Sequence, residues 1–168
     1  MWTKLLVPHD FSPCAARALS TAVELAKVHR AELALVHVSD LPANLPPDTL
    51  IHPDGAAGPV RVDDYTTDGA RKQLEIIADP LRREGLAVHT FAVTGGVAEQ
   101  LLALAGEIGA AAFVIGTHGR KGLSHLLLGS VAEKVVRGAS VPVVCVRTRS
   151  PEALPTGEER SVEDELAG

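Results

Sequence analysis

The sequence predicts an α/β fold in which five parallel strands form one doubly wound sheet between layers of helices. Short apolar runs alternate with amphipathic stretches along the chain, and this order requires parallel strands joined by helical crossovers. Hydrophobic residues make up 46% of the chain but aromatic residues only 3%, so Ala, Val, Leu and Ile must build the core. These side chains suit a parallel sheet that is covered on both faces. At 168 residues, we expect one domain.

The first half of the chain contains two strands, two helices and a long loop. Ser12 and Pro13 are typical of a helix start, an N-cap followed by proline at the first helical position. Pro80 lies inside the second helix and is expected to kink that helix or end it early. The loop holds five of the 11 prolines and is either a lid, a partner surface or a tolerated excursion. The predicted elements are a strand over 4–7, a helix over 13–30, a strand over 31–38, the loop over 39–62 and a helix over 64–84.

The second half alternates strands and helices without a long interruption. Gly95 and Gly96 precede a helix, and Gly109 is expected to end it. The predicted elements are a strand over 87–93, a helix over 97–107, a strand over 111–115, a helix over 131–137 and a strand from Val141 to Val146. No internal repeat is present, so residues 1–148 are expected to form the domain. Residues 149–168 are rich in Pro and Glu, and we expect an acidic, disordered tail there.

Charge and hydrophobicity argue against nucleic-acid and membrane partners. The net charge is −5, and from Arg149 onward the chain holds six carboxylates against two arginines. Binding to a nucleic-acid backbone needs clustered cations instead. No apolar run approaches the roughly 20 residues that span a bilayer, and no signal peptide precedes the first strand. The simplest expected location is the cytoplasm.

A glycine-rich segment joins the predicted strand over 111–115 to the helix that begins near Val131. Gly116 and Gly119 are spaced Gly-x-x-Gly, and Gly129-Ser130 follows after nine further residues. Glycines let backbone N–H groups approach an anion closely, and a helix N-terminus adds about half a positive charge. The segment lacks the Lys-Ser/Thr ending of the P-loop and the Gly-x-Gly start of the dinucleotide fingerprint. The pattern therefore predicts an anion site of another kind.

The spacing Gly-x-x-Gly, nine residues, Gly-Ser resembles the nucleotide loop of the universal stress protein family. Three further segments resemble this family's strands in the same order: residues 6–12 (Leu-Val-Pro-His-Asp-Phe-Ser), 35–38 (Leu-Val-His-Val) and 140–146 (Ser-Val-Pro-Val-Val-Cys-Val). The resemblance covers residues 3–147. It implies the strand order 3-2-1-4-5 and a flavodoxin-like, adenine nucleotide α-hydrolase-like sandwich.

The resemblance also implies an ATP site at the carboxyl ends of the strands. Asp10 would accept hydrogen bonds from the ribose, and Val38 would present backbone groups to the adenine edge. The glycines would let amides meet the phosphates, and Ser130 would donate a hydroxyl. The full predicted set is Pro8, His9, Asp10, Val38, Gly116, His118, Gly119, Arg120, Gly129, Ser130 and Val131. Magnesium would be held mainly through the phosphates.

Simpler interpretations of the same residues stay open. Asp10 could only support the turn into the first helix, and Ser130 could be an ordinary N-cap. Gly129 could serve tight packing, and the Val38 side chain is expected in the core. Arg120, with its neighbour Lys121, either clamps the triphosphate or lies in solvent.

The histidines and cysteines do not form a recognisable metal site. His9, His118 and His125 could lie near one crevice, but no pair has tight ligand spacing, so no metal ligation by side chains is predicted. Cys14 is either a redox sensor at a helix start or a small buried residue. Cys145, inside a Val-rich strand, is expected to serve packing.

No residue is recognisable as a general base for phosphoryl transfer, so the chain is predicted not to be an enzyme, with at most slow ATP hydrolysis. We expect a nucleotide-dependent stress-response dimer that pairs through the Val141–Val146 edge strand. The alternative is a dimeric interaction or chaperone-like protein of the same family that does not bind ATP.

Overall fold

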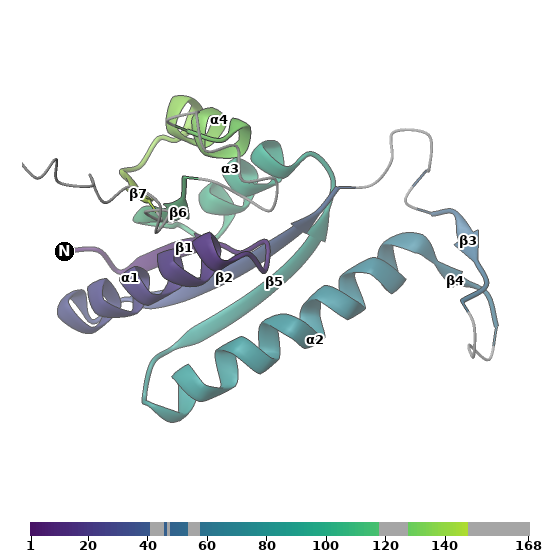
Figure 1. Ribbon diagram of the computed structural model, residues 1–168, viewed down its shortest axis with the longest axis horizontal. Helices are drawn as coiled ribbons and strands as arrows, with labels where there is room; N and C mark the ends of the chain where they lie inside the picture. The colour runs from purple at the N-terminus through teal and green to yellow at the C-terminus, as the bar shows by residue number, and fades with distance from the viewer. Residues whose placement is uncertain (41–45, 47, 54–57, 118–127, 148–168) are drawn as a thin grey trace, which may run out of the picture.

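Five parallel strands form the central sheet of the computed structural model, which describes residues 1–40, 46, 48–53, 58–117 and 128–147 (Figure 1). The strands lie in the order β5-β2-β1-β6-β7. Counted within this sheet, the order is 3-2-1-4-5, which confirms the expected fold. The strands are β1 (Lys4–Pro8), β2 (Glu32–Ser39), β5 (Val88–Thr94), β6 (Ala112–Gly116) and β7 (Val143–Val146). All neighbouring pairs are parallel, so the carboxyl ends of the five strands lie along one edge.

Helices cover both faces of the sheet. The helices are α1 (Pro13–His29), α2 (Val62–Arg83), α3 (Val97–Glu107) and α4 (Ser130–Gly138). α1 and α2 pack on one face, and α3 and α4 pack on the other (Figure 1). Side chains of β1 alternate between the two layers: Leu5 and Val7 pack in the core under α1 and α2, whereas Leu6 packs in the core under α3 and α4. The period of two therefore buries both faces of this strand.

Helix α2 continues for three residues past Pro80 and ends at Arg83, so of the two expected effects, a kink or an early end, the early end does not occur. The last turn is held by contacts within the helix and by one contact to β5. The Arg82 guanidinium bonds the carboxylates of Glu75 and Asp79 and donates to the Val88 carbonyl at 2.9 Å. Arg82 thereby ties the end of α2 to the start of β5.

A short hairpin lies in the segment between β2 and α2. β3 (Leu50–Ile51) and β4 (Val60–Arg61) pair antiparallel, with Leu50 opposite Arg61. The hairpin projects from the first turn of α2, away from the central sheet (Figure 1). The sequence did not predict it, because strands of two residues are too short to show an alternating pattern.

Strand β7 forms one outer edge of the sheet, as expected, although it begins at Val143 rather than Val141. Val144 and Val146 pack against the core under α1. Cys145 is exposed, so its expected role in packing is wrong for the single chain. The physical reason is the edge position, since β7 has a neighbouring strand on one side only.

Candidate functional site

The carboxyl ends of β1 and β6 lie side by side where the helical connections change faces. β1 leads into α1 on one face of the sheet, and the chain after β6 leads into α4 on the other. In doubly wound sheets, such a switch point opens a crevice that binds ligands. The residues predicted for the site at the end of β1 and at the end of β6, Pro8 and Gly116, lie near this point.

The turn after β1 is built from residues of the predicted site. Pro8 ends the strand, and the His9 side chain is buried. An Asp10 carboxylate oxygen accepts a hydrogen bond from the Ser12 N–H at 3.1 Å, and the Ser12 hydroxyl oxygen accepts one from the Ala15 N–H at 3.2 Å. Ser12 is thus the N-cap of α1, as predicted. Asp10 supports the turn into α1, and its role toward a ligand stays a prediction.

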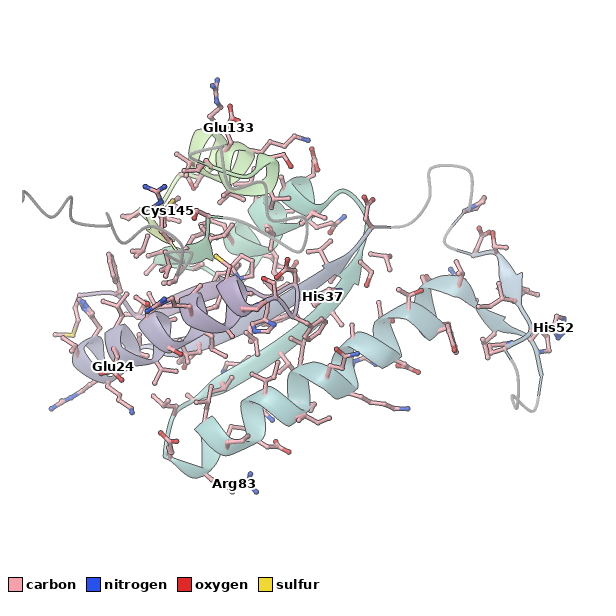
Figure 2. All side chains as sticks on the ribbon, in the orientation of Figure 1. Glu24, His37, His52, Arg83, Glu133 and Cys145 are labelled. Carbon is pink, nitrogen blue, oxygen red and sulfur yellow. The ribbon has the colours of Figure 1, made fainter. Side chains whose placement is uncertain are left out.

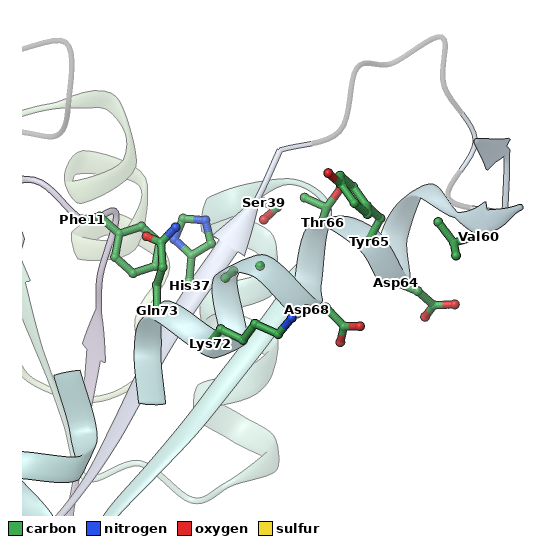
Figure 3. Close-up of a pocket in the computed structure, with 12 residues that line it drawn as sticks. Phe11, His37, Ser39, Val60, Asp64, Tyr65, Thr66, Asp68, Lys72 and Gln73 are labelled. Atoms are coloured by element: carbon green, nitrogen blue, oxygen red, sulfur yellow. The ribbon is translucent and has the colours of Figure 1, made fainter. Parts of the chain in front are cut away.

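Two imidazole rings and a phenyl ring pack together behind this turn; His37 is labelled in Figure 2, and Figure 3 shows it beside Phe11. The Phe11 ring centroid lies 4.6 Å from that of His37 and 5.3 Å from that of His9. His9 Nδ1 accepts the Phe11 N–H at 3.2 Å, so this nitrogen carries no proton. His37 Nδ1 lies 2.7 Å from the His9 carbonyl oxygen, which can only accept, so His37 Nδ1 carries one. Burial lowers the pKa of His9, and the nearby Asp10 partly opposes this effect while His37 adds to it.

Val38 directs its backbone toward β1 and its side chain toward the core. The His9 N–H donates to the Val36 carbonyl at 2.8 Å, which shows that even-numbered residues of β2 face β1. Val38 has the same parity, so its N–H and C=O also face the β1 side, two residues beyond the Pro8–Val36 pair that ends the ladder. Its side chain packs with the core under α3 and α4, as expected.

Backbone hydrogen bonds join the residue after β6 to the end of β7 and to the start of α4. The Thr117 N–H donates to the Val146 carbonyl at 2.9 Å, and the Gly129 N–H donates to the Thr117 carbonyl at 2.7 Å. Thr117 itself is buried. Thr117 and Gly129 therefore lie side by side at the end of β6.

Gly116 has a packing reason to lack a side chain. A Cβ atom at this position would lie 2.8 Å from the Cys14 Sγ and 3.1 Å from the Cys14 carbonyl oxygen. Cys14 is buried in the first turn of α1, in agreement with the packing alternative for this residue. Gly116 thus lets β6 approach α1, whether or not its amide also meets a ligand.

The N-terminus of α4 faces a cavity of about 240 Å³. Gly129 is the N-cap and Ser130 the first helical residue, so Ser130 is not the N-cap. No side chain of the described residues caps this end. The first N–H groups of a helix have no partner within the helix, so the end of α4 is electropositive. The cavity is lined by Asp40, Gly96, Val97, Ala98, Glu99, Ser130, Val131 and Lys134.

A larger cavity of about 670 Å³ lies on the opposite side of β2, against α2 (Figure 3). Phe11 and His37 form its inner wall, and Tyr65 and Lys72 belong to its α2 wall. The sequence did not predict this cavity. No local motif could have indicated it, because its walls come from the β1–α1 turn, β2, the hairpin and α2.

Several predicted site residues lie outside the described residues: His118, Gly119 and Arg120, together with Lys121 and His125. Within the described ranges, no three His, Cys, Asp or Glu side chains gather in a way that could hold a metal ion. Among the same residues, no helix is both long and apolar enough to cross a bilayer.

Comparison with known proteins identifies relatives along nearly the whole chain. The model of the universal stress protein family matches residues 1–147. The universal stress protein YxiE of Bacillus subtilis is 32% identical over 155 residues, which cover 88% of this chain and 100% of YxiE. The universal stress protein MJ0577 of Methanocaldococcus jannaschii is 29% identical over 158 residues, covering 89% and 98% of the two chains.

Solved structures show the same architecture. The structure of MJ0577 superimposes with a TM-score of 0.70 and 25% identity, covering 89% of this chain and 99% of its own. A universal stress protein from Archaeoglobus fulgidus, solved in complex with dAMP, superimposes with a TM-score of 0.60 and 24% identity, covering 86% and 97%. The second likeness shows the fold alone.

Proposed function

This chain belongs to the universal stress protein family, and from that premise we propose that it binds ATP and acts as a nucleotide-dependent dimer in a stress response. One observation carries the proposal: the N-terminus of α4, which no side chain of the described residues caps, faces a cavity that Asp40 after β2 and the start of α3 also line. The Archaeoglobus fulgidus protein that was solved with dAMP has this fold, which supports an adenine nucleotide as the ligand class.

The nucleotide would lie across the crevice with its base near β2 and its phosphates near α4. The Val38 N–H and C=O would meet the adenine edge, and Asp10 would meet the ribose. The amides of Gly129 and Val131 and the Ser130 hydroxyl lie where the phosphates would bind. The predicted contacts of Pro8, His9, Gly116, His118, Gly119 and Arg120 complete this proposed site. Mg²⁺ would bind mainly through the phosphate oxygens.

We propose binding with slow or negligible hydrolysis. Phosphoryl transfer needs charge stabilisation at the transferred group and a residue that positions the attacking water. At the described end of α4, the Lys134 ammonium lies 3.7 Å from the Glu99 carboxylate, and both side chains are exposed. This pair bridges α3 and α4 at the cavity rim. We assign the pair to the cavity wall rather than to catalysis.

The proposed dimer pairs through β7. This strand is an edge of the sheet and is formed by Val143, Val144, Cys145 and Val146. An apolar edge with unpaired backbone groups favours pairing with another strand. A second copy would cover the exposed Cys145 and satisfy the outer backbone groups of β7.

Native mass spectrometry tests ATP binding directly. The wild type, Gly119→Val and Gly106→Val are compared before and after addition of MgATP. Gly106 is the matched control because a Cβ at this position of α3 meets no atom within 4 Å. We expect an ATP-sized adduct on the wild type and on Gly106→Val, and its loss on Gly119→Val. Absence of an adduct from the wild type at millimolar MgATP would favour the dimeric interaction protein that binds no ATP.

A further inference from the structure

The end of β2 departs from a regular parallel ladder at Val38. In a regular ladder, each residue that faces the partner strand donates to one residue there and accepts from the residue two positions later. Val36 accepts from the His9 N–H at 2.8 Å. The next two bonds would run from the Val38 N–H to the His9 carbonyl, and from the Phe11 N–H to the Val38 carbonyl.

Both of these ladder partners instead form hydrogen bonds with imidazole rings. The His37 Nδ1–H donates to the His9 carbonyl at 2.7 Å. The Phe11 N–H donates to His9 Nδ1 at 3.2 Å. Among the described residues, the backbone hydrogen bonds include neither ladder bond of Val38. The N–H and C=O of Val38 therefore point together toward the crevice beyond the end of β1.

The conformation of Phe11 maintains this arrangement. Its φ of 63° lies in the left-handed region, which is unfavourable for a residue with a large side chain. This left-handed backbone lies directly before the N-cap Ser12, where the chain turns into α1. The Phe11 ring packs on both imidazoles, so it holds the two rings that occupy the ladder partners. Burial of His9 lowers its pKa and keeps Nδ1 available as an acceptor.

We propose that His9 and His37 are positioning residues that hold the backbone donor and acceptor of Val38 open for the adenine base. Adenine presents a ring-nitrogen acceptor beside its amino donor, which matches one backbone N–H beside one C=O. This inference rests on the proposed function. It adds that recognition of the base depends on the His9 and His37 side chains, which act through the backbone of Val38.

Hydrogen exchange of the Val38 amide in the nucleotide-free protein, followed by NMR, tests the geometry in wild type, His37→Phe, His37→Asn and His89→Phe. In His37→Phe, the His9 carbonyl is released and the Val38 amide should bond to it and exchange more slowly. Asn places an amide donor near the position of Nδ1, so His37→Asn should exchange as the wild type does. His89, exposed near the start of β5 at the opposite end of the sheet, is the matched control.

Titration with MgATP tests the consequence. We expect His37→Phe to bind ATP roughly tenfold more weakly, the loss of about one hydrogen bond, while His37→Asn and His89→Phe stay within about twofold of the wild type. In the wild type, ATP should slow exchange at Val38, which gives a measurement that needs no variant. Unchanged Val38 exchange in His37→Phe, or absence of ATP protection at Val38 in a wild type that binds ATP, overturns the inference. If the wild type binds no ATP at all, the proposed function itself fails.

Discussion

Replacing Gly116 with alanine should destabilise the fold, because the added methyl group has no space. The new carbon would lie 2.8 Å from the Cys14 Sγ, 3.1 Å from its carbonyl oxygen and 3.2 Å from its carbonyl carbon. Two of these atoms are backbone of the first turn of α1, so β6 and α1 must separate. Overpacking of this kind costs about 1–3 kcal/mol of unfolding free energy. With a slope of about 2 kcal/mol per molar urea, the unfolding midpoint should fall by about 0.5–1.5 M.

Equilibrium urea unfolding followed by circular dichroism measures this shift. Gly106→Ala is the control, because Gly106 lies exposed in the last turn of α3 with open space around it, and this variant should gain at most about 0.5–1 kcal/mol. Cys14→Ala combined with Gly116→Ala removes the Sγ contact but leaves the two backbone contacts, so the pair should recover part of the loss. A midpoint of Gly116→Ala equal to that of the wild type, or strict additivity in the double variant, would refute the packing argument.

Three further predictions concern stability, pH and the edge strand. Leu74→Ala, at a fully buried position of α2, should cost about 2–5 kcal/mol of unfolding free energy. Ile76 is 73% exposed, so Ile76→Ala should change the unfolding free energy by no more than about 0.5 kcal/mol; urea midpoints measure both. The folded-state pKa of His9 is lowered, so the unfolded chain binds a proton at His9 first as the pH falls. The free energy of unfolding should therefore decrease below about pH 6.5. In His9→Gln, the free energy of unfolding should depend less on pH between about pH 7.5 and 5.5. Alkylation of Cys145 should slow as protein concentration rises and a second copy covers β7; a rate independent of concentration would contradict the dimer.

The layers of the fold could be predicted because they follow from local patterns. Apolar runs without alternation indicate strands covered on both faces, and Leu5, Leu6 and Val7 indeed divide between two cores. Ser12 and Pro13 indicate a helix start by residue type alone, and both occupy the expected positions. The strand order came from the family resemblance, since the number of alternating elements does not determine how they are arranged.

The missed features depend on contacts between segments that are distant in the sequence. The exposure of Cys145 follows from the edge position of β7, and a Val-rich run looks the same in a central strand. The hydrogen bond from His37 to the His9 carbonyl spans 28 residues of sequence. Within its own strand, His37 is only one polar residue in an apolar run, so no spacing indicated its contact with the turn after β1.

The two histidines bear on how such a site gains affinity without direct contact to its ligand. At the end of a strand, a hydrogen bond to the neighbouring strand competes with a hydrogen bond to a ligand. A backbone N–H that pairs with the neighbouring strand must lose that bond before it can bind a base. Such a bond contributes about 0.5–1.5 kcal/mol net, and the loss would be subtracted from the binding free energy. Since His37 and His9 already bond to the two ladder partners of Val38, the closed arrangement would have to share or break these bonds. In the proposed site, the turn favours the binding-competent backbone, and Phe11 and the two imidazole rings preorganise it.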